Sequence, residues 1–296
     1  MQKINTLLSL SSLSILALTF ALPACDEPLG DEDSVAQDDK DEPPRTGQIL
    51  LEDGTELTYV VKNGNAMFEG DISLGDADEL ETSFRSAGSK VFPSAAAWPG
   101  GVVHFQIQPG FQSQWIVPAI AEFESKTGIR FINSPDAQGR FVLIGDNGPG
   151  SGCWANYGRS SNNQPTRVNI SVADGCDTFR VLVHEFGHVV GLFHEHTRSD
   201  RDAFVSIVWD NIIATDVARF AYKKWKKTGL LGADLGPYDY DSVMHYTSRG
   251  FVVNDGKSNT YTMTRKDNGQ PITRTEDWGL SAGDVAGIQF LYFSGN

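Results

Sequence analysis

The stretch from His184 to His194 constrains this chain most, because it reads His-Glu-x-x-His-x-x-Gly-x-x-His. On a helix, His184 and His188 lie one turn apart on the same face, where both can bind a single metal ion. Glu185 lies between them, where its carboxylate can reach a water molecule on that metal. Three imidazole ligands and one open position are typical of catalytic zinc, whereas a structural zinc site is closed by a fourth protein ligand.

Gly191 explains how the third histidine can reach the other two. Glycine tolerates the left-handed conformation in which many helices end, so the chain can leave the helix here and turn back. The turn brings His194 toward His184 and His188. The additional glycine and histidine also make a chance match far rarer than for His-Glu-x-x-His alone. We therefore predict one Zn²⁺ per chain, bound by these three histidines, rather than a helix with ordinary core histidines.

The charge of the chain is concentrated near its N-terminus. The formal net charge is −14 for 296 residues. Residues 1–90 hold 6 basic and 18 acidic residues, a net charge of −12, whereas residues 91–296 hold 18 and 20, a net charge of −2. The part with the histidines is therefore nearly neutral, and we expect no nucleic-acid partner.

The first 47 residues predict an export signal and a tether. An apolar stretch over residues 4–22 ends in Leu-Pro-Ala-Cys at Cys25, which resembles a bacterial lipobox with a lipidated cysteine. Pro23 is atypical there, so ordinary signal cleavage stays open. Residues 26–47 are acidic with few apolar side chains, and we expect them to be disordered. The chain is expected to be a cell-envelope lipoprotein or a secreted protein, with membrane contact only through a lipid at Cys25.

The rest of the chain predicts alternating strands and helices. Residues 48–61 read as a strand or hairpin that turns at Asp53-Gly54. A short motif at residues 68–72 follows, and after it a polar, loosely ordered stretch is expected up to Lys90. Strands are predicted over 102–108, 129–132, 141–144, 167–172 and 205–208, and helices over 111–126, 178–190, 215–227 and 281–293. Ser281 and Asp284 have the spacing of a capping box. The pattern favours an α+β fold with a mixed sheet backed by helices.

Three cysteines allow one disulfide at most. An odd count in an exported protein suggests one disulfide and one thiol with another fate. Because Cys25 ends the export signal, Cys153 and Cys176 are the natural pair, with two buried free thiols as the alternative. Closing their loop would stabilise the fold by about 3 kcal/mol in the chain-entropy treatment.

Several separated segments carry a family resemblance. The histidine motif continues through Glu195 and Arg198 into Asp-Arg-Asp at residues 200–202, and residues 237–246 read Pro-Tyr-Asp-Tyr-Asp-Ser-Val-Met-His-Tyr. These segments resemble the signature and the Met-turn of the astacin family of zinc endopeptidases, within the metzincins. The resemblance covers residues 98–292. It implies a two-lobed metzincin fold, with a mixed twisted sheet and two long helices, including the zinc helix, in the N-terminal lobe. The C-terminal lobe would be mostly irregular with a final helix.

The resemblance also implies roles for individual residues. Glu185 would be the general base for a zinc-activated water, and Tyr246 would stabilise the oxyanion. Met244 would form an apolar floor below the zinc, and Glu195 would be linked to the mature N-terminus without binding the metal. The family usually has a second disulfide, for which this chain has no cysteine. The remaining histidines, His104, His196 and His245, are expected on the surface or in the core.

Phe68-Glu69-Gly70-Asp71-Ile72 resembles the prosegment motif of astacins, whose aspartate occupies the water position on zinc. A carboxylate is a good zinc ligand, and Gly70 lets the backbone approach closely. We therefore expect residues 48–90 to be an inhibitory propeptide with Asp71 as its switch, and residues 91–296 to be the catalytic domain. The alternative is that Gly70-Asp71 is only a turn.

The predicted function is hydrolysis of peptide bonds in proteins by a monomeric zinc endopeptidase that is made as a zymogen. A catalytically silent relative that binds peptides is one alternative, and a zinc hydrolase of a non-peptide amide or ester is another. Profiling of cleavage sites in a peptide library separates the three.

Overall fold

A computed structural model describes residues 45–50, 56–87, 97–160, 163–224, 234–275 and 277–294. The predicted signal, Cys25, residues 26–44 of the predicted tether and the Asp53-Gly54 turn lie outside these residues. The tether was predicted to extend to residue 47, which was wrong at its end, because Thr46 and Gly47 belong to a strand. Within the described part of the chain, no helix combines the length and the apolar character needed to cross a membrane.

Among the described residues, the central element is a mixed sheet of nine strands in the order β1-β2-β3-β4-β8-β9-β7-β5-β6. Its second half consists of β5 (Val102–Ile107), β6 (Arg130–Asn133), β7 (Val142–Gly145), β8 (Cys153–Asn156) and β9 (Thr166–Ile170). All neighbouring strands in this half are parallel except β8 and β9, which are antiparallel. Four of these strands lie within two residues of the prediction; β8 was not predicted.

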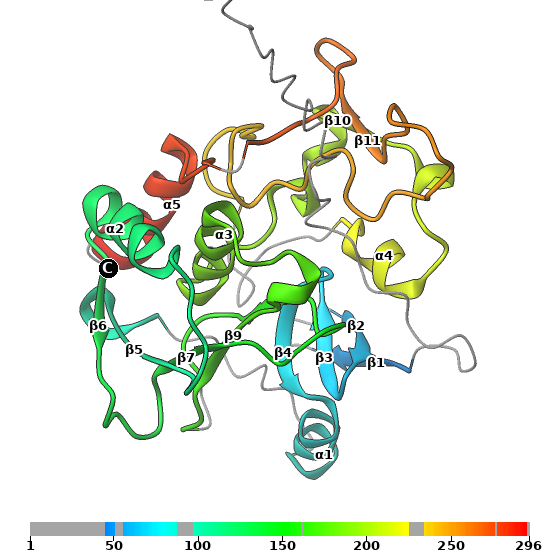
Figure 1. The fold of residues 1–296 in the computed structure, drawn as a ribbon. Helices are drawn as coiled ribbons and strands as arrows, with labels where there is room; N and C mark the ends of the chain where they lie inside the picture. The colour runs from blue at the N-terminus through cyan, green and yellow to red at the C-terminus, as the bar shows by residue number, and fades with distance from the viewer. Residues whose placement is uncertain are drawn as a thin grey trace, which may run out of the picture. The chain divides into compact units, whose positions relative to one another are not determined.

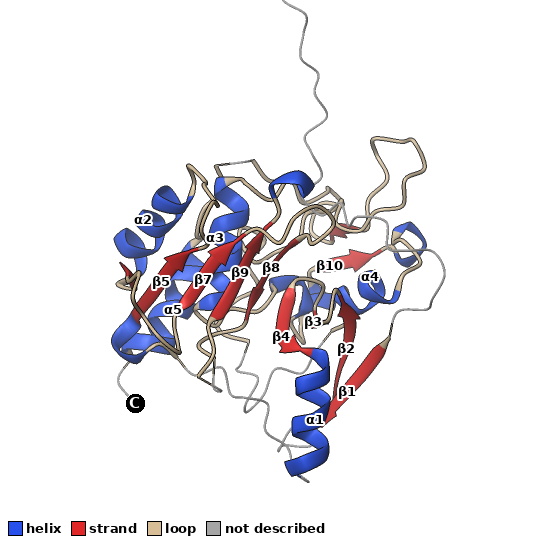
Figure 2. Ribbon diagram, turned by 60° about the horizontal axis from the view of Figure 1, so that its bottom comes forward, coloured by secondary structure: helices blue, strands red, loops and turns tan. Residues whose placement is uncertain are grey.

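Two helices cover one side of this half of the sheet, as Figures 1 and 2 show. They are α2 (Ile116–Thr127) and α3 (Phe179–Val189). The prediction started α2 too early, at residue 111, and treated Pro118 as an interior residue. In the structure Pro118 lies in the first turn, where the absent N–H breaks no helical hydrogen bond. Phe123 of α2 and Phe186 of α3 pack edge to face in the core, with ring centroids 6.3 Å apart.

The N-terminal segment, residues 45–87, extends the sheet. Its strands β1 (Thr46–Leu50), β2 (Glu56–Lys62), β3 (Asn65–Phe68) and β4 (Ile72–Asp76) pair antiparallel in sequence order, which confirms the predicted hairpin. Next to the other half of the sheet, β4 pairs in parallel with β8, so that Ile72 lies opposite Ala155. The N-terminal segment therefore occupies the edge that β8 would otherwise expose.

The prediction of a loosely ordered stretch up to Lys90 was wrong, because residues 77–87 form α1 (Ala77–Ala87). Asp76 caps this helix: its Oδ1 accepts hydrogen bonds from the amides of Asp78 and Glu79, at 3.0 and 2.9 Å. Ala77 and Leu80 are buried in the small core of the N-terminal segment. The cap and these two apolar contacts support the helix in a sequence that is otherwise polar, together with ion pairs from Arg45 to Asp78 and Glu81.

The chain after His194 is mostly irregular, as predicted for the C-terminal lobe. It contains β10 (Val205–Ile207), β11 (Met263–Arg265), α4 (Asp216–Ala221) and α5 (Ala282–Phe293). The helix α4 ends earlier than predicted, where the hydroxyl of Tyr222 donates to the carbonyl of Gly250 at 2.5 Å. The capping box of Ser281 and Asp284 is confirmed. Single 3₁₀ turns cover Pro99–Gly101, Val172–Asp174, Glu195–Thr197, Arg201–Ala203 and Trp209–Asn211.

Candidate metal centre and active site

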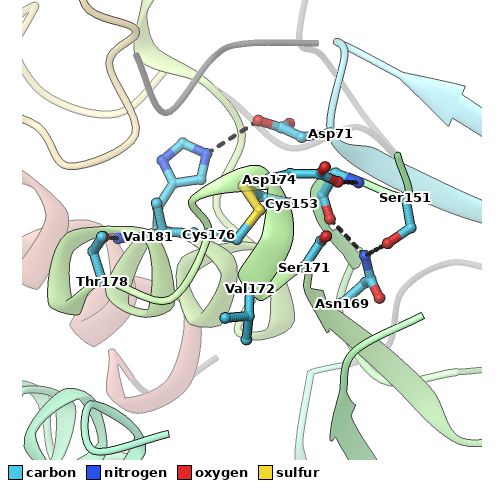
Figure 3. The surroundings of a disulfide bond; sticks show 12 residues. Asp71, Ser151, Cys153, Asn169, Ser171, Val172, Asp174, Cys176, Thr178 and Val181 are labelled. Atoms are coloured by element: carbon cyan, nitrogen blue, oxygen red, sulfur yellow. Dashed lines mark hydrogen bonds and ion pairs between the residues drawn. A yellow bond between two sulfur atoms is a disulfide. The ribbon is translucent and has the colours of Figure 1, made fainter. Parts of the chain in front are cut away.

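The helix with the histidine motif is fixed at its N-terminus by a cap and a disulfide. Thr178 Oγ1 accepts a hydrogen bond from the amide of Val181 at 3.2 Å, which satisfies an N–H group that has no partner within the helix. Cys176, just before the helix, is bonded to Cys153 of β8, with the two Cα atoms 5.5 Å apart (Figure 3). The predicted disulfide is therefore confirmed.

The loop between the two cysteines has its own anchor. The carboxylate of Asp174 accepts hydrogen bonds from the amides of Gly150 and Gly152, at 3.0 and 2.8 Å. These bonds lower the pKa of Asp174, although burial on its own would raise it. The disulfide and Asp174 together hold the start of α3 against β8, so the first histidine of the motif has a fixed support.

The three motif histidines converge on one point. The Nε2 atoms of His184 and His194 lie 3.2 Å apart. The ring of His188 faces both, with its centroid 4.8 Å from each of theirs. Gly191 makes this possible, because it ends α3 with a φ of 100° and allows the chain to reverse toward His194.

Asp71 of the N-terminal segment completes the cluster. Its Oδ1 lies 3.1 Å from His194 Nε2 and 3.4 Å from His188 Nε2, and its Oδ2 lies 3.4 Å from His184 Nε2. One ligand atom from each of the four residues lies within 4.8 Å of the others. The structure thus brings together residues that are more than a hundred positions apart in the sequence.

Each of the three histidines has an acceptor for the N–H group at Nδ1, and this hydrogen bond fixes the orientation of the ring. His184 Nδ1 donates to the carbonyl of Val243 at 2.8 Å, and His188 Nδ1 donates to the carbonyl of Leu192 at 2.9 Å. His194 Nδ1 lies 3.0 Å from the carboxylate of Glu69. With the proton on Nδ1, a neutral imidazole directs the lone pair of Nε2 toward the centre of the cluster.

This donor set fits a tetrahedral zinc ion. Zinc–nitrogen bonds of ordinary length place neighbouring ligand atoms about 3.3 Å apart. Here the Nε2 atoms of His184 and His194 lie 3.2 Å apart, and each of the three Nε2 atoms lies 3.1 to 3.4 Å from an oxygen of Asp71. Moreover, His188 Nε2 and Asp71 Oδ1 are buried without a hydrogen bond among the described residues. Three imidazoles and one carboxylate can therefore hold one metal ion.

The charges around the cluster make it a site for a cation. Burial would raise the pKa of Asp71, but the charge of His194 and the close approach of the three histidine rings lower it well below its usual value. Burial would likewise lower the pKa of His194, but the carboxylates of Asp71 and Glu69 raise it to about 9. Burial lowers the pKa of His188 to about 4. Without a metal, a proton on His194 would neutralise part of this negative charge.

Gly70 lets the aspartate reach the histidines. Its φ is 99°, and an added Cβ would lie 2.6 Å from the hydroxyl of Tyr246. That hydroxyl donates to the carbonyl of Glu69 at 2.9 Å and to Asp71 Oδ2 at 3.2 Å. The candidate oxyanion donor therefore contacts the N-terminal segment.

The other predicted site residues surround the cluster. Glu185 is 1% exposed and borders a cavity of about 70 Å³ with Asp71, His184 and Tyr246. Met244 is buried below α3, where a Cβ added to Gly187 would collide with its sulfur. Met244 thus has the position expected for an apolar floor.

Glu195 is not part of the metal cluster, as predicted. Its Oε1 accepts a hydrogen bond from the amide of Asp239 at 2.7 Å and lies 3.6 Å from the guanidinium of Arg198. It borders a cavity of about 350 Å³, which also contacts Leu291 of α5.

The remaining three histidines lie on the surface or in the core, as predicted. None of them belongs to the metal cluster of the described residues. His104 is exposed and bonds Ser134. His196 and His245 are buried, and burial lowers the pKa of each.

Glu69 is the site residue that the sequence did not identify. Its position in the sequence, next to Gly70, does not indicate a role at the metal site. That role depends on contacts with His194, which is distant in the sequence.

Comparisons with known proteins agree with this geometry. Residues 91–293 match the profile of the peptidase family described as Astacin. The chain is 31% identical to zinc metalloproteinase nas-7 of Caenorhabditis elegans over 202 residues, which is 67% of this chain and 49% of that protein. It is 34% identical to an astacin-like metalloendopeptidase of Gallus gallus over 203 residues, 66% of this chain and 46% of that protein.

A solved structure has the same fold. It is high choriolytic enzyme 1 of Oryzias latipes, a hatching-enzyme zinc protease, with a TM-score of 0.55 and 26% identity over 67% of this chain and 92% of that one. The α+β fold and the metal cluster are of the metzincin type. The chain belongs to the astacin family. It spans about half the length, or less, of the curated relatives named above.

Proposed function

We propose that this chain is the zymogen of a zinc endopeptidase that hydrolyses peptide bonds in proteins. The observation that carries the proposal is the convergence of the three motif histidines and Asp71, whose ligand atoms lie within 4.8 Å of one another, beside the buried carboxylate of Glu185. His184, His188 and His194 would hold the ion. Zinc, when bound, supplies Lewis acidity and lowers the pKa of a water molecule to about 7.

The chain's own residues would supply proton transfer and charge stabilisation. Glu185 would accept the proton of the attacking water and deliver it to the leaving amine, the usual work of a general base that later acts as an acid. Tyr246 would donate a hydrogen bond to the oxyanion. In the uncleaved chain its proton is already shared between Glu69 and Asp71, so this donor is withheld from substrate.

Latency would follow from three contacts of the N-terminal segment, acting as an inhibitory propeptide. Asp71 fills the position that water would take beside the histidines, at 3.1 to 3.4 Å from their Nε2 atoms. β4 pairs with β8, the strand along which an extended peptide would otherwise lie. Asn156 also donates to the carbonyl of Ser73 at 3.0 Å, which holds β4 in place. Cleavage between Arg85 and Ala97 would allow this segment to leave.

The test of the peptidase function uses Glu185→Ala in a chain whose N-terminal segment has been cleaved and removed. We expect the variant to retain one zinc per chain but to lose about 10²–10⁴-fold in kcat on a protein substrate. A peptide library assayed beside amide and ester substrates separates an endopeptidase from the other zinc hydrolases. Parental cleavage by Glu185→Ala contradicts the mechanism, and no cleavage by the parent favours a silent peptide-binding relative.

Export and a lipid at Cys25 complete the proposal. They are supported by the apolar stretch and the lipobox-like ending of residues 22–25. Mass spectrometry of protein from its native host tests this: a diacylglyceryl-modified N-terminal cysteine is expected. An intact, unmodified peptide that spans Cys25 contradicts it.

A further inference from the structure

The three histidines differ in where their Nδ1 partners come from. His184 and His188 donate to backbone carbonyls of Val243 and Leu192, which belong to the proposed catalytic domain. His194 instead faces Glu69, which belongs to the N-terminal segment. Two rings are therefore oriented from within the catalytic domain, whereas the third is oriented by the part that cleavage would remove.

Glu69 contacts His194 at two atoms. Its Oε2 lies 3.0 Å from His194 Nδ1 and accepts a hydrogen bond from the His194 amide at 3.3 Å. The side chain of Glu69 is fully buried. Its φ is 54°, a left-handed conformation that is unfavourable for a residue with a Cβ. A charged residue is therefore buried in an unfavourable backbone conformation, and its carboxylate is directed at one ligand.

We propose that Glu69 is a positioning residue of the metal site, through which the N-terminal segment raises the zinc affinity of the uncleaved chain. This rests on the proposed function, in which His194 is a zinc ligand. Carboxylates that accept the outer N–H of a ligating histidine fix its ring and increase its basicity, and their loss typically weakens metal binding about 10–100-fold. The N-terminal segment thus helps to load the site that it also blocks.

Asp71 and Glu69 contribute in different ways. Asp71 faces the Nε2 atoms from inside the cluster and would contact the ion itself. Glu69 acts from the far side of the His194 ring and does not enter the cluster. A change at Glu69 therefore alters the orientation of one ligand and leaves the number of ligands unchanged.

The experiment measures zinc affinity of the uncleaved chain by competition with a chromophoric chelator. All proteins carry Glu185→Ala, so that none can cleave itself. Glu69→Ala is expected to bind zinc about 10–100-fold more weakly than its parent. Glu69→Gln retains an acceptor of the same size and is expected to lose less. Glu56→Ala changes an exposed carboxylate of β2 in the same segment and is expected to have the parental affinity.

A second readout separates positioning from general loosening. The visible spectrum of the Co²⁺-substituted protein reports on ligand geometry, and it should change in Glu69→Ala but not in Glu56→Ala. Parental zinc affinity and a parental Co²⁺ spectrum in Glu69→Ala overturn the proposal. If that variant does not fold, the same two parental results for Glu69→Gln overturn it. Because no turnover is measured, a failure of the peptidase proposal leaves these results unaffected.

Discussion

The carboxylate of Asp71 and the imidazole of His194 lie 3.1 Å apart, although one residue belongs to the N-terminal segment and the other ends the histidine motif. The contact makes Asp71 a fourth member of the candidate metal site. It also means that the site of an astacin-family chain is filled from within the same polypeptide.

Gly70 should be required for latency. In Gly70→Ala the new Cβ would lie 2.6 Å from the hydroxyl of Tyr246, at a residue whose φ is already 99°. Gly75→Ala is the matched control, because φ is 107° there but nothing lies within 4 Å of the added Cβ. The collision should cost about 1–3 kcal/mol beyond the shared backbone strain. We expect the uncleaved Gly70 variant to show about 10-fold more residual activity than the Gly75 variant; equal activities would contradict this.

Tyr246→Phe should separate catalysis from metal binding. The change removes one hydroxyl that contacts Glu69 and Asp71 in this state, and it removes no atom of the metal cluster. After removal of the N-terminal segment, kcat should fall about 10²–10³-fold, the usual loss of one oxyanion donor. Zinc content measured by elemental analysis should remain one per chain. Loss of the metal would mean that the tyrosine has a different role.

The fold of the chain from Trp98 onward was largely predictable because its elements are local. The spacing of the histidines and Gly191 defines a helix that ends in a left-handed turn, and α3 follows this closely. The Ser281–Asp284 capping box likewise depends only on neighbouring residues. The ligand cluster itself could be predicted because three of its four residues lie within one such local unit.

The contacts between distant segments could not be predicted in the same way. The parallel pairing of Ile72 with Ala155 depends on how two strands meet in space, and the short strand β8 has no clear pattern of its own. The role of Glu69 depends on the same docking, because only then does its side chain reach His194. The helix α1 was missed because its cap and two apolar contacts are weak signals in a polar sequence.

The disulfide should stabilise the start of the zinc helix. A bond between Cys153 and Cys176 closes a loop with a sequence separation of 23, and such loops typically contribute about 2–4 kcal/mol. The double variant Cys153→Ala/Cys176→Ala should lose this amount in free energy of unfolding, measured by urea denaturation. Cys153→Ala alone should lose about as much, since either change breaks the bond. An effect below about 0.5 kcal/mol, within the range of a surface substitution, would contradict the prediction.

Latency should persist at mildly acidic pH. In the metal-free docked state the pKa of Asp71 is lowered well below its usual value, despite burial, which acts in the opposite direction. The positive charge of a bound zinc ion would act in the same direction as the charge of His194. Because the pKa is depressed, the stabilisation of the docked state by this carboxylate is fully present above the unfolded pKa of about 4. It is lost only as the pH falls through the lower pKa of the docked state. A fluorescent peptide hydroxamate should therefore bind the uncleaved chain equally poorly at pH 7 and pH 5. The released catalytic domain serves as the control for the probe, and binding that appears between these pH values would contradict the prediction.

The central claim is that Asp71 holds an otherwise competent site inactive, and one measurement tests it most directly. Asp71→Ala is assayed for cleavage of a protein substrate as an uncleaved chain, beside the parent and the double variant Asp71→Ala/Glu185→Ala. Zinc content and chain length are verified before and after the assay. We expect the uncleaved Asp71→Ala chain to cleave substrate at least about 10-fold faster than the parent, since the loss of one charged ligand contact exceeds about 1.4 kcal/mol. The double variant should be inactive. An uncleaved, zinc-loaded Asp71→Ala chain as inactive as the parent would contradict the account.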